Sequence, residues 1–290
     1  IAKVPGICYV QTHLFTRDSL MPKQIINGVE LFYDERGAGE PIIFHHGYTG
    51  AHDVWLDEIA PRLQHKYRCI VMDCRGAGDS EYPAEGHNIP QYARDVVAMA
   101  DALGLEKFTY VGHSMGGGVG YQLGIEHGAR LNKLILVAPI PAGGIHADPK
   151  VLESGMALRA APTGRDTMIQ QRQLLRLRAS DADIILGVDR ARSVSDKHYV
   201  DSWHSMGEFN VTDRLPELTT PTLIIAGAAD GLCVANVNDW QLLPNGTLHV
   251  FSRVGHGVPR DVPDEFAVVV DDFMEHGVIN ARTLLARLTG

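Results

Sequence analysis

The chain has 290 residues, of which 45% are hydrophobic and 21% are charged, and its formal net charge is −9. This length suits one large α/β domain with an insertion, or two small domains, and the composition is ordinary for a globular protein. The negative charge and the lack of a Lys/Arg-rich run argue against a nucleic-acid partner. No stretch of the sequence reaches 18 apolar residues, so we predict neither a membrane span nor a membrane partner.

Residues 1–20 show neither clear hydrophobic periodicity nor the long apolar core of a signal peptide. We therefore interpret them as an N-terminal tail outside the fold. The four cysteines are scattered without CxxC spacing, which is typical of free thiols in a reducing compartment and favours a cytoplasmic location. They are Cys8, Cys69, Cys74 and Cys233.

The first convincing element is a β-hairpin over residues 23–35. Two β-prone runs flank Asn27 and Gly28, a pair that suits a type I′ turn. Short apolar runs follow, and because polar and apolar residues do not alternate in them, we expect strands that are buried on both faces of a parallel sheet. These runs cover residues 41–44, 68–73, 108–112, 133–138, 222–227 and 247–252.

Amphipathic segments separate several of these runs. Residues 90–104 place Tyr92, Val96 and Ala100 on one stripe, and residues 264–277 end at a glycine, which is a helix stop signal. Alternating strands and helices predict an α/β fold, in which an open, mostly parallel sheet carries helices on both faces.

Residues 141–214 break this alternation. The segment opens with "PAGGIHADP" and continues as a helical pattern without a buried strand. It is too long to be a simple connection. We therefore predict a helical cap over one end of the sheet, with residues 21–140 and 215–290 forming the core.

The segment "VGHSMGG" (111–117) places a serine where a predicted strand meets a helix. G-x-S-x-G at such a turn is the nucleophile-elbow pattern, and in an open parallel sheet ligands bind beyond the carboxyl ends of the strands. A serine needs a base, and the base needs an acceptor that fixes its tautomer. Asp230 and His256 follow the last two apolar runs, so we predict that Ser114 is the nucleophile, His256 the base and Asp230 the acid.

A tetrahedral oxyanion also needs hydrogen-bond donors. We expect the backbone N–H of Met115 and that of Tyr48 in the glycine-rich "HHGYTG", with Thr49 as second choice for the latter. His46 in the same loop is a candidate for the substrate pocket.

The cap segment "DSWHSMGEF" (201–209) supplies three further pocket candidates, Trp203, Met206 and Phe209. At helical spacing, such residues are also typical of cap core. Asp213 is a rival acid, but it precedes its strand rather than following it.

From Pro22 to Gly277 the chain resembles α/β-hydrolase-fold proteins. The resemblance rests on "HHGYTG", "DCRGAGDS", "VGHSMGG", "PTLIIAGAAD" and "VGHGVPRDVPDEF", which occur in the family's order. It implies an eight-stranded, mostly parallel sheet, a helical cap after the sixth strand, and Ser-His-Asp chemistry on the three residues predicted above. The sequence departs from many relatives at Asp261, where they have Glu.

These features predict a serine hydrolase without cofactor that cleaves a carboxylic ester or lactone of a small molecule. No metal site is expected, because His45 and His46 lack partners at metal-ligand spacing. Asp73 and Arg75 are interpreted as parts of a structured turn. C–C bond hydrolysis and perhydrolase or haloperoxidase-like activity use the same triad and stay open, as does a small-molecule receptor with little turnover.

Overall fold

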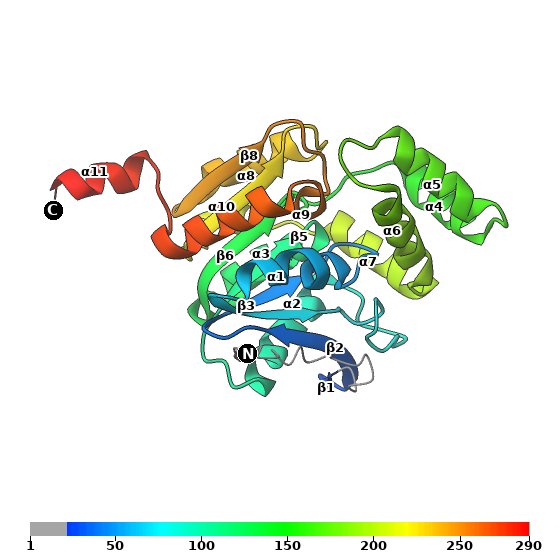
Figure 1. Ribbon diagram of the computed structural model, residues 1–290, viewed down its shortest axis with the longest axis horizontal. Helices are drawn as coiled ribbons and strands as arrows, with labels where there is room; N and C mark the ends of the chain where they lie inside the picture. The colour runs from blue at the N-terminus through cyan, green and yellow to red at the C-terminus, as the bar shows by residue number, and fades with distance from the viewer. Residues whose placement is uncertain (1–21, 290) are drawn as a thin grey trace, which may run out of the picture.

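The computed structural model describes residues 22–289, so the predicted tail and Cys8 lie outside the described residues. Eight strands form one sheet in the order β1-β2-β4-β3-β5-β6-β7-β8 (Figure 1). The strands are β1 (Lys23–Ile26), β2 (Val29–Arg36), β3 (Glu40–His45), β4 (Tyr67–Met72), β5 (Phe108–His113), β6 (Leu131–Val137), β7 (Thr222–Gly227) and β8 (Gly246–Phe251).

Only the N-terminal end of the sheet is antiparallel. Strand β1 pairs with β2 across a turn in which Asn27 and Gly28 both have positive φ, 48° and 79°, as a type I′ turn requires. Strand β2 runs antiparallel to β4, and every later pair is parallel. The mostly parallel eight-stranded sheet is therefore confirmed.

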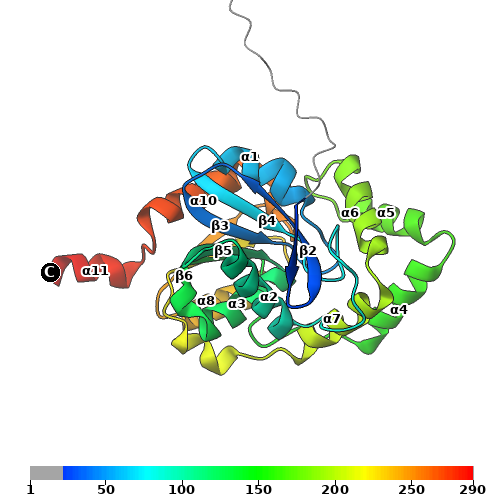
Figure 2. The same cartoon turned by 90° about the horizontal axis from the view of Figure 1, so that it is seen from below.

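Helices cover both faces of the sheet, as Figure 2 shows. Successive residues of β5 point to opposite sides: Tyr110 packs with Tyr92 on one side, and Val111 packs with Trp55 and Phe266 on the other. The core helices are η1 (Val54–Ile59), α1 (Ala60–Leu63), α2 (Ile89–Ala102), α3 (Met115–Glu126), η2 (Gly128–Arg130), η3 (Thr212–Glu217), α8 (Cys233–Leu242), α9 (Val258–Asp261) and α10 (Pro263–His276).

Between β6 and η3 the chain forms four α-helices without a strand, and these helices lie together to one side of the sheet (Figure 2). We call them the cap: α4 (Pro149–Ala160), α5 (Gly164–Leu174), α6 (Asp181–Ser193) and α7 (Asp196–Glu208). Arg190 of α6 makes a two-pronged ion pair with Asp53 of the core, at 2.8 and 2.9 Å. The Tyr48 hydroxyl donates to the Tyr199 carbonyl of α7 at 2.5 Å. These contacts hold the cap above the loop that follows β3.

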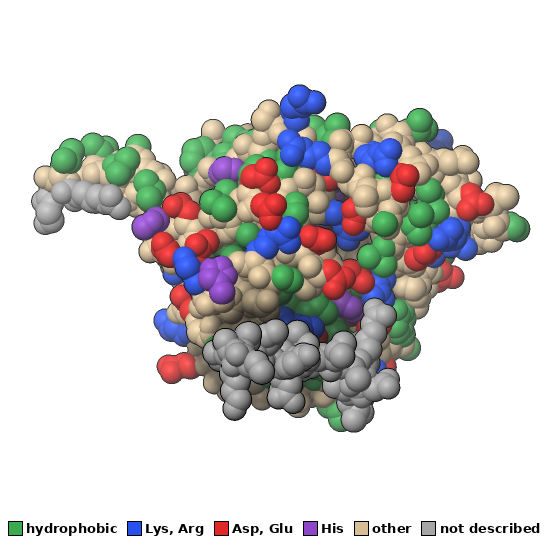
Figure 3. Space-filling model, in the orientation of Figure 1, with side chains coloured by type: hydrophobic (Ala, Val, Ile, Leu, Met, Phe, Trp, Pro, Cys, Tyr) green, Lys and Arg blue, Asp and Glu red, His purple; other side chains and the backbone are tan. Residues whose placement is uncertain are grey.

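The last helix, α11 (Ala281–Thr289), projects away from the body in both ribbon views (Figures 1 and 2). Hydrophobic side chains are visible on it in the space-filling view (Figure 3), and Leu285 and Leu288 are exposed there. Over residues 22–289, none of the helices combines the length and the apolar character that crossing a membrane requires.

Candidate active site

Ser114 occupies a sharp turn between β5 and α3. Its backbone has φ 56° and ψ −114°, a conformation that residues other than glycine rarely adopt and that the surrounding structure must enforce. A Cβ atom on Gly112 would lie 2.1 Å from the Gly116 carbonyl oxygen, and one on Gly116 would lie 2.7 Å from that of His46. Only glycines fit at these two positions, so the turn has the geometry of a nucleophile elbow.

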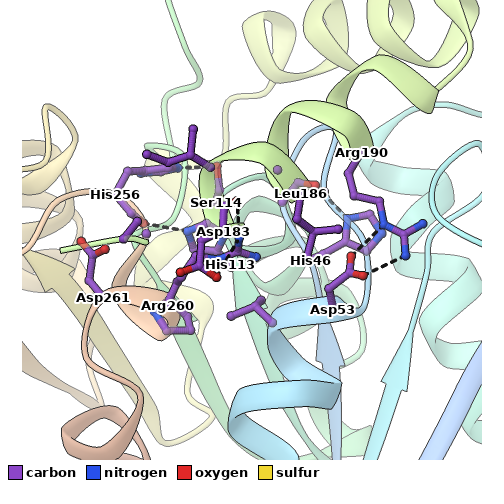
Figure 4. A pocket seen from close by; sticks show the side chains of 18 of the residues that line it. His46, Asp53, His113, Ser114, Asp183, Leu186, Arg190, His256, Arg260 and Asp261 are labelled. Carbon is purple, nitrogen blue, oxygen red and sulfur yellow. Dashed lines mark hydrogen bonds and ion pairs between the residues drawn. The ribbon is translucent and has the colours of Figure 1, made fainter. Parts of the chain in front are cut away.

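The structure brings the three predicted triad residues together. His256 Nε2 lies 2.9 Å from Ser114 Oγ (Figure 4). His256 Nδ1 lies 2.8 Å from Asp230 Oδ2. Because a carboxylate only accepts, Nδ1–H donates to Asp230, and Nε2 is left to accept the proton of the serine hydroxyl. This is the orientation that a general base needs.

The carboxylate of Asp230 is held in its ionised form. Burial alone would raise the pKa of Asp230, but the hydrogen bond with His256 and the N–H of Leu232, which donates to Oδ1 at 3.1 Å, lower it below its ordinary value. Asp230 therefore offers a negative charge to the imidazole across the range in which proteins function.

Two backbone donors near Ser114 lack an acceptor within the described part of the chain. Met115 is the first residue of α3, and Tyr48 lies in the turn after β3. The backbone N–H of neither residue donates to another described residue. The two segments pack closely, because a Cβ on Gly47 would lie 2.9 Å from the Cβ of Ser114. These N–H groups are the ones expected to bind an oxyanion.

His113 adds a contact that the sequence did not indicate. Its Nε2–H donates to the backbone carbonyl of His256 at 2.8 Å. Burial, followed by the neighbouring His256, lowers the pKa of His113 to about 3, so the ring stays neutral and keeps this tautomer. The residue before Ser114 thus ties the loop of His256 to the elbow.

The predicted pocket residue His46 borders the cavity but is fully engaged by the backbone. Its Nδ1–H donates to the Gly47 carbonyl at 2.8 Å, and its Nε2 accepts the N–H of Cys74 at 3.1 Å. Burial lowers the pKa of His46, which keeps the ring neutral. His46 therefore shapes the loop that carries Tyr48.

Beneath this loop, the Asp73 carboxylate lies close to His52 and Asp79, and ligand atoms of the three come within 4.8 Å of one another. Asp73 already accepts the N–H and Nδ1–H of His52, each at 2.7 Å, and the N–H of Asp79 at 2.8 Å. Arg75 pairs with Asp95 at 2.6 and 2.8 Å. These bonds give Asp73 and Arg75 the structural role expected of a turn.

A cavity of about 440 Å³ opens on Ser114 between the core and the cap (Figure 4). The cap contributes residues of α5, of α6 and of the segment that joins them. Sequence reasoning missed these lining residues, because an amphipathic pattern shows which helix face is buried and not what it is buried against. They include Arg172, Leu175, Leu177, Ile184 and Leu186.

The three cap residues proposed for the pocket do not line this cavity. Met206 and Phe209 are 2% and 7% exposed and belong to the core cluster that contains Tyr92, while Trp203 packs against that cluster. They face the core from α7 and from the residue that ends it, which is the alternative role considered for them. The rival acid Asp213 lies in η3, away from the cavity lining.

A family model described as alpha/beta hydrolase fold matches residues 40–259, a range that contains Ser114, Asp230 and His256. A non-heme haloperoxidase from Rhodococcus erythropolis is 30% identical over 251 residues, which cover 80% of this chain and 91% of the relative. A non-heme chloroperoxidase from Streptomyces lividans is 28% identical, covering 82% of this chain and 93% of the relative. The solved structure of Est816, described as an N-acyl homoserine lactone degrading enzyme, has a TM-score of 0.74 at 27% identity, covering 87% of this chain and 100% of that one.

Proposed function

The chain belongs to the α/β-hydrolase-fold family, and we propose that it is a serine hydrolase that cleaves carboxylic esters or lactones of small molecules. The observation that carries the proposal is the hydrogen-bonded series from Ser114 Oγ through His256 to Asp230, at 2.9 and 2.8 Å, at the base of an open cavity. The likeness to Est816 supports the lactone half of the proposal.

In the first half of the proposed reaction, Ser114 Oγ attacks the carbonyl carbon of the substrate, and its proton passes to His256 Nε2. Asp230 stabilises the imidazolium that forms. The negative carbonyl oxygen accepts hydrogen bonds from the N–H groups of Met115 and Tyr48. The intermediate then expels the alkoxide, which takes the proton from His256 and leaves an acyl group on Ser114.

Water completes the cycle. His256 Nε2, now neutral, removes a proton from a water molecule that attacks the acyl carbon. When this second intermediate collapses, the proton returns to Ser114 Oγ and the carboxylic acid is released. In a lactone the hydroxyl group formed by ring opening stays part of the acyl chain throughout, so the released product is a hydroxy acid.

A screen of chromogenic esters and of lactones against the purified protein tests the proposal. We expect many equivalents of product per protein molecule, and we expect Ser114→Ala to abolish this turnover, since loss of a triad serine costs several orders of magnitude in rate. Turnover in Ser114→Ala within about tenfold of the wild type would refute the assignment of the nucleophile.

A further inference from the structure

The mouth of the cavity carries large apolar side chains that face solvent. Leu175 and Leu177, just after the end of α5, are 84% and 54% exposed. Leu186 of α6 is 36% exposed. Single exposed leucines are common, but a group of them beside a cavity is typical of a surface that contacts a ligand.

These leucines are continuous with the candidate catalytic centre. Leu175, Leu177 and Leu186 line the same cavity as Ser114 and His256, and Leu186 is drawn among the lining side chains in Figure 4. A Cβ on Gly255, the residue before His256, would lie 3.7 Å from Leu177 Cδ1. The cap therefore places Leu177 directly against the loop of the candidate base.

Apolar lining continues toward the interior of the cavity. Trp55 and Ile184 both line it and are 0% and 6% exposed. An apolar path thus runs from the inner wall of the cavity to its solvent-exposed edge.

Several charged groups of the lining are already paired. Arg190 neutralises Asp53 at 2.8 and 2.9 Å. Arg260 donates to the Asp183 carbonyl at 2.8 Å and lies 3.7 Å from its carboxylate. Because these groups are engaged with one another, they add no unpaired charge to the apolar path. Arg172 lines the same cavity and is the charged competitor that the experiments below must separate from the leucines.

We propose that Leu175, Leu177 and Leu186, the leucine rim, form a subsite for an unbranched alkyl chain of the substrate. The inference rests on the proposed function and narrows its substrate class to esters or lactones that carry a medium-length alkyl chain. Such a chain would remove its own methylene groups and the exposed leucine surface from water together, and this favours binding in proportion to the apolar area buried.

The first test is a chain-length series. Straight-chain esters from acetate to octanoate are compared by kcat/KM, as are acetates of straight-chain alcohols, so that a chain on either side of the ester bond is sampled. We expect kcat/KM to rise at least about tenfold along one series or the other, because each buried methylene adds to binding. If both series are flat or fall with length, the proposal is wrong.

The second test places the effect on the rim. In the double variant Leu175→Ser, Leu177→Ser, the ratio of kcat/KM for the long ester to that for acetate should fall about tenfold, while Leu175→Met, Leu177→Met should keep it. The matched control is Leu284→Ser, Leu288→Ser, which alters exposed leucines of α11 far from the cavity and should leave the ratio unchanged. An unchanged ratio in the rim variant overturns the proposal.

A binding measurement separates this inference from the proposed function. Ser114→Ala, which cannot form an acyl-enzyme, is titrated calorimetrically with ethyl octanoate and ethyl acetate, and we expect the octanoate to bind at least about tenfold more tightly. If no ester is turned over but this difference is found, the proposed function fails and the subsite stands. Arg172 also lines the cavity and forms no ion pair within the described residues. A preference for short esters that bear a carboxylate would indicate that Arg172 binds the substrate at the cavity mouth, and it would overturn the leucine subsite.

Discussion

The proposed role of Asp230 depends on the hydrogen bond that its carboxylate accepts from His256 Nδ1. Substitution by asparagine changes this bond and keeps the size of the side chain. An amide at this position can donate to His256 Nδ1, which favours the tautomer with the proton on Nε2. That nitrogen then cannot accept the proton of Ser114. We therefore predict that Asp230→Asn lowers kcat by at least about a thousandfold on any ester that the wild type turns over.

The control for this substitution is Asp213→Asn. Asp213 lies in η3, outside the cavity lining, and should tolerate the same change with little effect on kcat. A larger loss from Asp213→Asn than from Asp230→Asn would reverse the assignment of the acid.

At the scale of the elements, the contact between α6 and the segment before η1 fixes the cap above the site. The side chains of Arg190 and Asp53 are 25% and 13% exposed, so their ion pair is screened less than one at the surface. Burial raises the pKa of Asp53, but the bonds from Arg190 outweigh this and lower it. Removing Arg190 would leave a partly buried carboxylate without its partner.

We predict that Arg190→Met destabilises the protein by about 1–3 kcal/mol, more than a surface pair contributes and less than a fully buried one. Asp53→Asn combined with Arg190→Met should cost less than the sum of the single changes. Urea denaturation measures both effects. The control is Arg165→Met, which breaks an exposed ion pair with Asp189 within the cap and should leave the unfolding transition near that of the wild type. If Arg165→Met and Arg190→Met destabilise the protein equally, the Arg190–Asp53 ion pair does not have the stabilising role described above.

The elements differ in how far their sequences predict them. The strands from β3 to β7 were recognisable because runs such as residues 223–226 are apolar and buried, as burial on both faces demands. The expected burial on both faces is wrong for β8, because this strand forms an edge of the sheet and its residues after Gly246 are only partly buried or exposed. The π-helix η1 was not predicted, because the sequence over Val54–Ile59 has no distinctive helical signature. Helices α8 and α11 were not predicted either. In α8 the buried side chains are those of Asn236 and Asp239, which are polar and mark no apolar stripe.

The candidate site divides in the same way. Ser114, Asp230 and His256 could be placed because each follows a strand, and parallel strands end at one edge of the sheet. The bond from His113 to the His256 carbonyl joins residues 143 positions apart through a backbone atom, so no residue pattern reports it. The roles of α5, α6 and α7 in the cap depended on tertiary packing that periodicity alone does not specify.

For the whole molecule, three buried histidines make stability depend on pH. Burial, reinforced by neighbouring histidines, lowers the pKa of His45, His113 and His198 from 6.5 to about 3. Between these values the unfolded chain takes up protons that the folded protein excludes. The free energy of unfolding is therefore highest above pH 6.5 and falls as the pH drops toward 3, by up to about 1.4 kcal/mol per pH unit for each ring.

We predict that His198→Gln lowers the slope of the free energy of unfolding against pH by the contribution of about one proton taken up on unfolding. This change in slope is independent of the variant's stability at neutral pH. Urea denaturation of the wild type and the variant between about pH 7.5 and pH 5 gives the two slopes. His276→Gln, at an exposed position on α10, should leave the slope as in the wild type. Identical slopes for the wild type and His198→Gln would mean that His198 does not titrate as described.

The proposed reaction passes through an acyl group on Ser114, and this species can be observed directly. The protein is mixed with an excess of an activated ester, quenched in acid at successive times and digested, and the peptide that contains Ser114 is examined by mass spectrometry. The account predicts that this peptide gains the mass of the acyl group before the steady state, and that the acyl group is lost at a rate at least equal to kcat once substrate is exhausted. Sustained turnover with no acyl group on Ser114, or a single acylation that never hydrolyses, would contradict it.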